Sequence, residues 1–118
     1  MNDCIFCKII AKEIKAEIIN ENDKIIVFKD HRPSAPIHLL IVPKKHSVNP
    51  YDTNQDTLGL MLKNAALIAV KNGIDKKGYR LTINVGEGGG QVVPHIHLHL
   101  LSGDRNSPET GGGDSVVS

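Results

Sequence analysis

Hydrophobic positions recur with a helical period in two parts of the chain. The segment 5–14 (IFCKIIAKEI) carries four isoleucines at spacings that fit one side of a helix, and it predicts a short amphipathic helix. Apolar residues also recur three and four positions apart over residues 56–72, which predicts the longest helix. Gly73 follows this segment and suits the left-handed position that ends many helices.

Short apolar or alternating segments around these helices predict a sheet. Strands are predicted at residues 18–20, 24–29, 37–42 and 79–85, and a fifth strand follows the glycine-rich loop at 86–90. We expect the last two strands to form a hairpin across that loop. Strands dominate and the helices lie between groups of them, so the pattern predicts an α+β fold with a central antiparallel sheet of about five strands, one long helix and one short helix.

Length and composition exclude several classes of protein. The 118 residues fit one domain. The chain has 14 Lys and Arg against 13 Asp and Glu, and the resulting net charge of +1 is not the strongly basic charge that indicates a nucleic-acid-binding protein. No apolar run approaches the roughly 20 residues of a membrane span, and the N-terminus lacks a secretory signal. We therefore expect a cytoplasmic protein that binds neither nucleic acid nor membrane, with a domain at 1–103 and a disordered, glycine-rich tail at 104–118.

The segment 94–103 (PHIHLHLLSG) places three of the six histidines of the chain at alternate positions. Successive side chains of a strand point to opposite faces, so His95, His97 and His99 are expected on one face, about 6–7 Å apart. Isoleucine and leucine lie between them and would cover the core. Solvent-facing strand positions favour other polar residues, so three histidines on one face indicate a catalytic or ligand-binding site.

Two chemistries fit such a face. Alternating histidines could hold a catalytic metal, which would need a further ligand and an open position. Alternatively, a neutral imidazole could attack an acyl or phosphoryl centre and form a transient covalent bond. The loop GEGGGQ at 86–91 directly precedes the histidines, and its backbone N–H groups could bind phosphoryl oxygens. This loop favours the chemistry of phosphorus.

These residues resemble a known family. The pattern at 95–101 (HIHLHLL) resembles the signature of the histidine triad (HIT) family, and the preceding GGGQ at 88–91 is similar to the motif found before that triad. Residues 5–19, 25–46 and 78–91 resemble the Hint branch of small nucleotide hydrolases. The resemblance extends from about residue 4 to residue 103.

The resemblance implies a fold, an activity and roles for four histidines. Hint-like proteins are homodimers of α+β subunits that bind purine nucleotides such as AMP or GMP. They hydrolyse purine nucleoside phosphoramidates and acyl-adenylates through a nucleotidyl-histidine intermediate. By position, His97 would be the nucleophile, and His99 would donate to a phosphoryl oxygen, with His95 beside it. His38 would orient the nucleophile through the backbone of a neighbour.

The resemblance also implies a nucleotide site. Asp30 would bind the ribose hydroxyls, and polar groups of the glycine-rich segment would surround the ribose and phosphate. The polar set is Asn84, Gly90 and Gln91, and the expected apolar walls of the base pocket are Phe6, Ile9, Ile14 and Phe28.

Three features depart from the family pattern. Val92 stands where eukaryotic members have a serine that contacts the phosphate or the leaving group. Pro94 stands where an aromatic residue usually precedes the triad, and proline fixes φ and lacks an N–H. The polar tail at 104–118 lacks the usual apolar C-terminal segment. Leaving-group preference is therefore open.

The two cysteines, Cys4 and Cys7, form a C-x-x-C motif that suggests a metal or redox site. Two thiolates do not complete a tetrahedral zinc site. The resemblance implies that His46 and His95 supply the other two ligands of a structural zinc. Redox cysteines and unliganded thiols remain alternatives. A closed four-ligand site has no open position, and a zinc-bound His95 would be less available to phosphate.

Three other functions remain open from the sequence alone. The nearest is a dinucleoside polyphosphate hydrolase of the same family, with a nucleotide as leaving group. A nucleotide-binding regulator with weak catalysis would bind AMP tightly but turn over slowly. A metalloenzyme centred on the triad would lose its activity to chelators.

Overall fold

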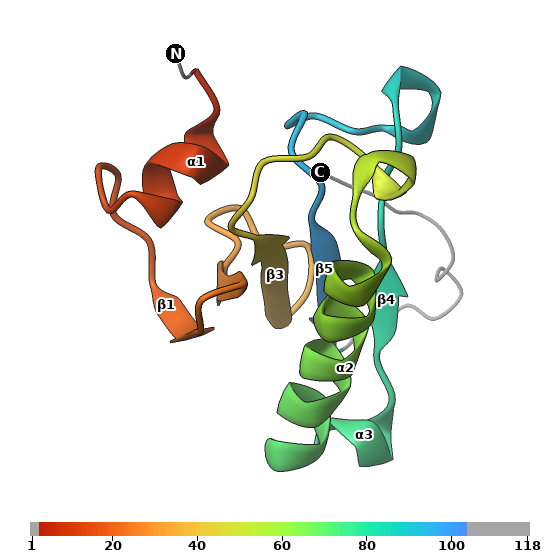
Figure 1. Cartoon of the computed structure of the whole chain (residues 1–118). Helices are drawn as coiled ribbons and strands as arrows, with labels where there is room; N and C mark the ends of the chain where they lie inside the picture. The colour runs from red at the N-terminus through yellow and green to blue at the C-terminus, as the bar shows by residue number, and fades with distance from the viewer. Residues whose placement is uncertain (1–2, 104–118) are drawn as a thin grey trace.

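The computed structural model describes residues 3–103, so the predicted tail at 104–118 lies outside the described residues. Its five strands form one antiparallel sheet in the order β1-β2-β3-β5-β4 (Figure 1), which confirms the predicted fold class. The strands are β1 (Ile18–Glu21), β2 (Ile25–Lys29), β3 (Ile37–Pro43), β4 (Arg80–Thr82) and β5 (Leu98–Ser102). The helices are α1 (Ile5–Ile10), α2 (Gln55–Lys71) and α3 (Ile74–Lys77), with 3₁₀ turns at Pro50–Asp52 and Glu87–Gly89. Within residues 3–103, no helix is long and apolar enough to cross a membrane.

The helices differ from the predicted ones at two places. Helix α1 ends four residues earlier than predicted, because Lys12 adopts a left-handed conformation with φ of 65° and the N–H of Glu13 bonds back to the carbonyl of Lys8 at 2.8 Å. Gly73, with φ of 73°, ends α2 as predicted. The short α3 that follows was not predicted, and its buried Ile74 anchors it.

Strand β5 begins later than predicted. It starts at Leu98, so only His99 of the three alternating histidines lies in the hydrogen-bonded ladder. Pro94 has no N–H to donate, and the N–H of Ile96 bonds to the carbonyl of Ser47 at 2.8 Å instead of to a strand. His95 and His97 therefore lie in the extended segment that leads into β5.

The sheet is covered on both faces, which explains the composition of its strands. Helix α2 packs on one face over a core that includes Val27, Ile41 and Leu100. Helix α1 lies beside β1 on the other side in Figure 1, and its Phe6 packs with Phe28 from β2. Since strand residues alternate, His38 on β3 and His99 on β5 point to the α1 face. The site is built on that face.

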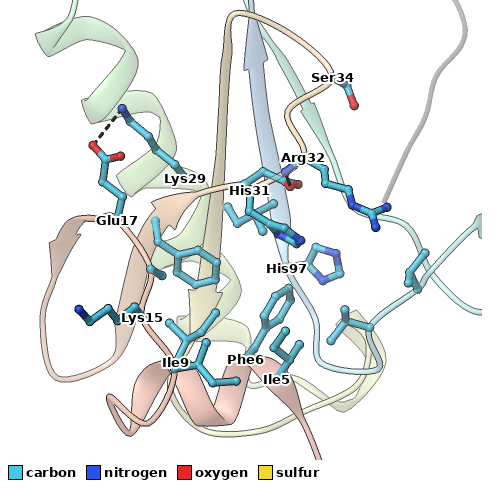
Figure 2. A pocket seen from close by; sticks show the side chains of 17 residues that line it. Ile5, Phe6, Ile9, Lys15, Glu17, Lys29, His31, Arg32, Ser34 and His97 are labelled. Carbon is cyan, nitrogen blue, oxygen red and sulfur yellow. Dashed lines mark hydrogen bonds and ion pairs between the residues drawn. The ribbon is translucent and has the colours of Figure 1, made fainter.

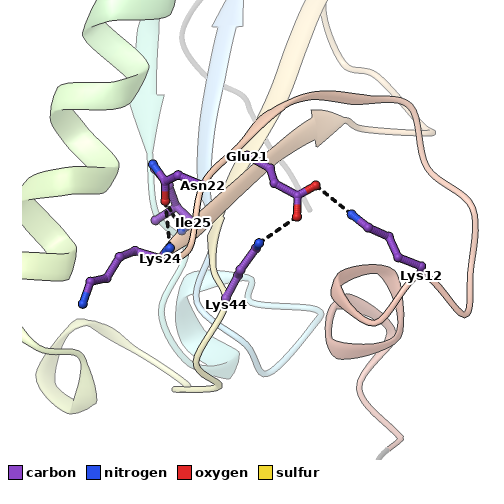
Figure 3. A network of polar contacts seen from close by, with 6 residues as sticks. All are labelled: Lys12, Glu21, Asn22, Lys24, Ile25 and Lys44. Atoms are coloured by element: carbon purple, nitrogen blue, oxygen red, sulfur yellow. Dashed lines mark hydrogen bonds and ion pairs between the residues drawn. The ribbon is translucent and has the colours of Figure 1, made fainter.

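A polar network ties the end of α1 to the sheet. The Glu21 carboxylate accepts hydrogen bonds from Lys12 and Lys44, each at 2.7 Å (Figure 3). Both lysines hold the pKa of Glu21 below its usual value. In the adjoining turn, the Asn22 side chain accepts from the N–H groups of Lys24 and Ile25. The network joins the segment after α1 to β1 and to the residue that follows β3.

Candidate active site

A pocket of about 910 Å³ opens between α1 and the α1 face of the sheet (Figure 2). Six residues named from the sequence line it, namely Phe6, Ile9, Ile14, Phe28, Asp30 and His97. Phe6, Ile9 and Phe28 form an apolar wall, with the rings of Phe6 and Phe28 packed edge to face at 5.6 Å. Such a wall is suited to a flat apolar group such as a nucleobase.

His97 lies at the inner end of this pocket and is only 2% exposed. Its Nδ1 is 2.8 Å from the backbone carbonyl oxygen of His95. A carbonyl only accepts, so Nδ1 carries the proton and donates it. In the neutral ring Nε2 then holds the lone pair, which is the form needed for attack on an electrophile. The rings of Phe6 and His97 form a T-shaped pair with their centroids 4.9 Å apart, and this contact limits rotation of the imidazole.

A chain of three groups fixes the protonation of His99. The backbone N–H of Ser34 donates to Nδ1 of His38 at 3.0 Å, so His38 carries its proton on Nε2. That Nε2–H donates to Nδ1 of His99 at 2.9 Å. His99 must therefore carry its own proton on Nε2. A backbone amide cannot reverse its role, so Ser34 sets the direction of the whole chain.

The Nε2–H of His99 is a buried donor without a hydrogen-bond partner among residues 3–103. Its ring centroid is 4.9 Å from that of His97. Burial lowers the pKa of His99 to about 3 and also lowers the pKa of His38, so both rings are neutral at pH 7. A buried donor is costly unless a ligand atom satisfies it, and a phosphoryl oxygen bound to His97 would do so.

Asp30 lies where the pocket meets the histidine chain. Its Oδ1 accepts from the N–H of Arg32 at 2.8 Å, which closes a tight turn. Its Oδ2 is 3.4 Å from Nε2 of His38, whose proton is directed to the closer nitrogen of His99. The carboxylate thus keeps acceptor capacity at the pocket, as a ribose-binding group needs.

The neutral histidines predict that acid weakens the fold. The pKa values of His38 and His99 are lowered on folding, that of His99 to about 3, so as the pH falls below about 6.5 the unfolded chain binds more protons than the folded one. The free energy of unfolding should fall by up to about 1.4 kcal/mol per pH unit for each histidine that stays neutral. Urea unfolding at pH 7 and pH 5, with a chelator in both buffers, measures this. His99→Asn should reduce the pH dependence of the free energy of unfolding, whereas the control His31→Asn, at an exposed position, should not. If the parent and His99→Asn lose equal stability between pH 7 and pH 5, the assignment of a neutral, buried His99 is wrong.

Asn84, Gly90 and Gln91, expected near the ribose and phosphate, do not line the pocket. The Gln91 amide donates to the carbonyl of Val48 at 2.7 Å and accepts from the N–H of Gly86 at 2.9 Å. Asn84 donates to the carbonyl of Gly89 at 2.8 Å, and Gly90 has φ of 81°. These residues hold the glycine-rich turn in shape.

The second predicted cluster is brought together beside the first. One ligand atom from each of Cys4, Cys7, His46 and His95 lies within 4.8 Å of the others. The S···N distances are 3.3 Å from Cys4 to His95, 3.3 Å from Cys7 to His46 and 3.6 Å from Cys7 to His95. Sulfur and nitrogen bound to one tetrahedral zinc lie about 3.5 Å apart, given bond lengths of about 2.3 and 2.0–2.1 Å. The spacing therefore fits a tetrahedral zinc site.

The protonation of His95 supports the same fit. Its Nε2 donates to the carbonyl of Pro43 at 2.8 Å, so its lone pair is on Nδ1, toward the two sulfur atoms. Burial lowers the pKa of His95 to about 4 and raises the pKa of Cys7. No disulfide links the cysteines.

A second group of metal-binding residue types, Asp30, His38 and His99, does not fit a metal. Nε2 of His38 would have to be a ligand, but Ser34 fixes the proton on that atom. The hydrogen-bond directions therefore disfavour a catalytic metal at the triad.

Sequence reasoning missed several pocket residues. Ser34 acts through its backbone N–H, which no side-chain pattern reveals. His31 and Arg32 line the pocket beside His97 and follow directly after Asp30, so their position next to a predicted site residue was the available signal. Nε2 of His38 contacts Nδ1 of His99 at 2.9 Å, and its expected action through the backbone of a neighbour of the nucleophile stays a prediction.

Comparisons with known proteins agree with this architecture. The HIT domain matches residues 11–106. The purine nucleoside phosphoramidase of Escherichia coli K12 is 43% identical over 90% of this chain and 92% of its own length. A 14 kDa zinc-binding protein of Brassica juncea is 41% identical over 86% of this chain and 93% of its own. The crystal structure of a HIT family hydrolase from Legionella pneumophila Philadelphia 1 superimposes with a TM-score of 0.82, at 48% identity over 87% of this chain and 95% of that one. On the evidence of its fold, its histidine cluster and these matches, the chain belongs to the HIT domain family.

Proposed function

We propose that this protein hydrolyses purine nucleoside phosphoramidates and acyl-adenylates with His97 as the nucleophile. One observation carries the proposal: the hydrogen bonds place a lone pair on Nε2 of His97 and an unused proton on Nε2 of the adjacent His99. A nucleophile beside a buried donor is the arrangement that phosphoryl transfer requires. The name of the Escherichia coli relative supports the substrate class.

The reaction follows from these two atoms. Nε2 of His97 attacks the α-phosphorus, a new P–N bond forms, and the bond to the substrate amine breaks as the amine takes up a proton from solvent, to which the water of the second step returns one. The Nε2–H of His99 donates to a phosphoryl oxygen as negative charge grows there. Water then attacks phosphorus and releases the nucleoside monophosphate, and Nε2 regains its lone pair. Over both steps one water is consumed, with its hydroxyl on phosphorus and its proton on the amine.

The pocket gives the nucleotide its orientation. The purine of AMP or GMP would lie against the apolar wall of Phe6, Ile9 and Phe28, with Ile14 beside it. The Asp30 carboxylate would accept hydrogen bonds from the ribose hydroxyls. This pose brings the α-phosphate to His97, because Asp30 and His97 line the same pocket.

We also propose that Cys4, Cys7, His46 and His95 hold a structural zinc ion. When bound, the ion would link the start of α1 to the segment before β5 and would offer no open coordination position for the reaction. The carbonyl of His95 orients His97, so the same residue would connect the two sites. Thiolates remain available for zinc in a reducing compartment, in line with the cytoplasmic location we propose.

A homodimer is proposed from the exposed apolar surface of α2. Leu62, Leu67 and Val70 are 49%, 56% and 60% exposed, which is a large apolar area for one helix. Strand β4 lies at the edge of the sheet and can also take part in an interface. Sedimentation equilibrium should give twice the chain mass, and a monomer at micromolar concentration would contradict the proposal.

The direct test is release of a fluorescent amine from an adenosine phosphoramidate, with and without a chelator. We expect steady release that survives brief chelation, because the reacting atoms belong to histidines. Activity lost at once to a chelator, and restored by zinc with the fold intact, would instead indicate a catalytic metal. Tight AMP binding without release would indicate a nucleotide-binding regulator. Faster cleavage of a dinucleoside polyphosphate would favour that substrate class.

A further inference from the structure

Arg32 occupies the mouth of the pocket. Its backbone is fixed because its N–H donates to Oδ1 of Asp30 at 2.8 Å. Its side chain lines the pocket together with His97, yet it is exposed, whereas His97 is buried at the inner end. Figure 2 shows the Arg32 guanidinium on the far side of His97 from Ile9 and Lys15.

In the described part of the chain, no acidic side chain neutralises the charge of Arg32. Among the residues lining the pocket, Glu17 pairs with Lys29 at 3.0 Å, and Asp30 is engaged by a backbone N–H and lies near His38. Within residues 3–103, no carboxylate lies at ion-pair distance from the Arg32 guanidinium. A guanidinium with five donors is therefore available to a ligand.

The direction of attack places the leaving group near this cation. In an in-line displacement, the leaving group departs on the side of phosphorus opposite to the nucleophile. His97 attacks from the buried end, so the leaving group points to the mouth, where Arg32 and His31 are exposed. Val92 also lines the mouth and is 72% exposed, but its side chain offers no hydrogen bond. Arg32 is thus the strongest anion-binding group on the leaving-group side.

We infer that Arg32 selects substrates whose leaving amine carries a carboxylate, as in nucleoside phosphoramidates of α-amino acids. This inference rests on the proposed function and names its substrate class more closely. In such a substrate the carboxylate carbon is only two bonds of about 1.5 Å each from the departing nitrogen, so both lie at the mouth of the pocket. A guanidinium binds a carboxylate through two parallel hydrogen bonds, which a lysine cannot reproduce. The carboxylate takes no part in the bond changes and serves only recognition.

Two matched substrates test this inference. Adenosine 5′-phosphoramidates of tryptophan and of tryptamine differ only in the carboxylate, and both release a fluorescent indole amine. We expect Arg32→Gln to lower kcat/KM for the tryptophan substrate about tenfold or more, which is the worth of a charged hydrogen bond. Arg32→Gln should cleave the tryptamine substrate with the kcat/KM of the parent. Arg32→Lys should keep part of the kcat/KM for the tryptophan substrate that Arg32→Gln loses.

Lys15→Gln is the matched control, because it removes the same charge from another exposed part of the pocket lining, on the other side of His97 from Arg32 in Figure 2. It should leave the ratio of the two kcat/KM values at that of the parent. An equal loss on both substrates in Arg32→Gln would show that Arg32 serves the nucleotide and not the leaving group, and no loss on either would also overturn the inference. If the parent cleaves neither substrate, the proposed function itself is wrong and the inference falls with it.

Discussion

Replacing His97 with alanine should abolish release of amine from an adenosine phosphoramidate while AMP continues to bind. The variant removes Nε2, the only atom to which the mechanism assigns the bond to phosphorus, so kcat should fall by about 10⁴-fold or more. The apolar wall and Asp30 remain, so the dissociation constant for AMP should change little. Stopped-flow fluorescence measures the first quantity and calorimetric titration the second.

Chemical rescue separates a lost nucleophile from a damaged fold. His97→Gly leaves room for a free imidazole beside Phe6, which packs against the native ring at 4.9 Å. Added imidazole should restore part of the turnover of this variant and should not affect the parent. If His97→Ala keeps more than about a tenth of the parental kcat, another group is the nucleophile and the proposed role is wrong.

Removing the metal ligands should cost stability rather than chemistry. Zinc at 100 times its dissociation constant stabilises the folded state by about 2.7 kcal/mol. In a domain of this size such a loss lowers Tm on the order of 10 °C. We expect a chelator to produce that shift in the parent, and Cys7→Ser to bind no zinc and melt at the lower temperature. Calorimetry and elemental analysis of zinc per chain measure the two effects.

The control for this experiment is a histidine outside the cluster. His31→Asn removes an exposed imidazole and should keep one zinc per chain and the parental Tm. A parent without zinc after purification in zinc-containing medium would contradict the structural site. So would an unchanged Tm on chelation, because a four-ligand link between α1 and the segment before β5 must resist unfolding.

The fold was largely predictable because its strands and helices follow local rules. The alternation of histidine with apolar residues before and within β5 predicted that Leu98 and Leu100 face the core, where they pack with residues of α2. Gly73 ends α2 because it adopts a left-handed backbone conformation. The early end of α1 was not predictable, since Lys12 has no intrinsic preference for positive φ. The late start of β5 depends on a bond from Ile96 to the distant Ser47, which no local pattern records.

Part of the candidate site could also be predicted from local patterns, and part could not. The sequence identified the residue types, and the structure shows which of them lie in contact. The histidine alternation led to His97 and His99, but the tautomer of each ring depends on the backbone groups of Ser34 and His95. The family resemblance implies that Gln91 lies near the ribose and phosphate, but it does not reveal that its amide donates to the distant carbonyl of Val48. Long-range backbone partners are the information that a single sequence lacks.

The stereochemical course at phosphorus tests the central proposal most directly. An adenosine phosphorothioamidate of one configuration would be hydrolysed in ¹⁸O-labelled water, and the configuration of the product would be determined by ³¹P NMR. Two successive in-line displacements, first by His97 and then by water, predict retention. Inversion would show that water attacks the substrate directly and would contradict covalent catalysis by His97.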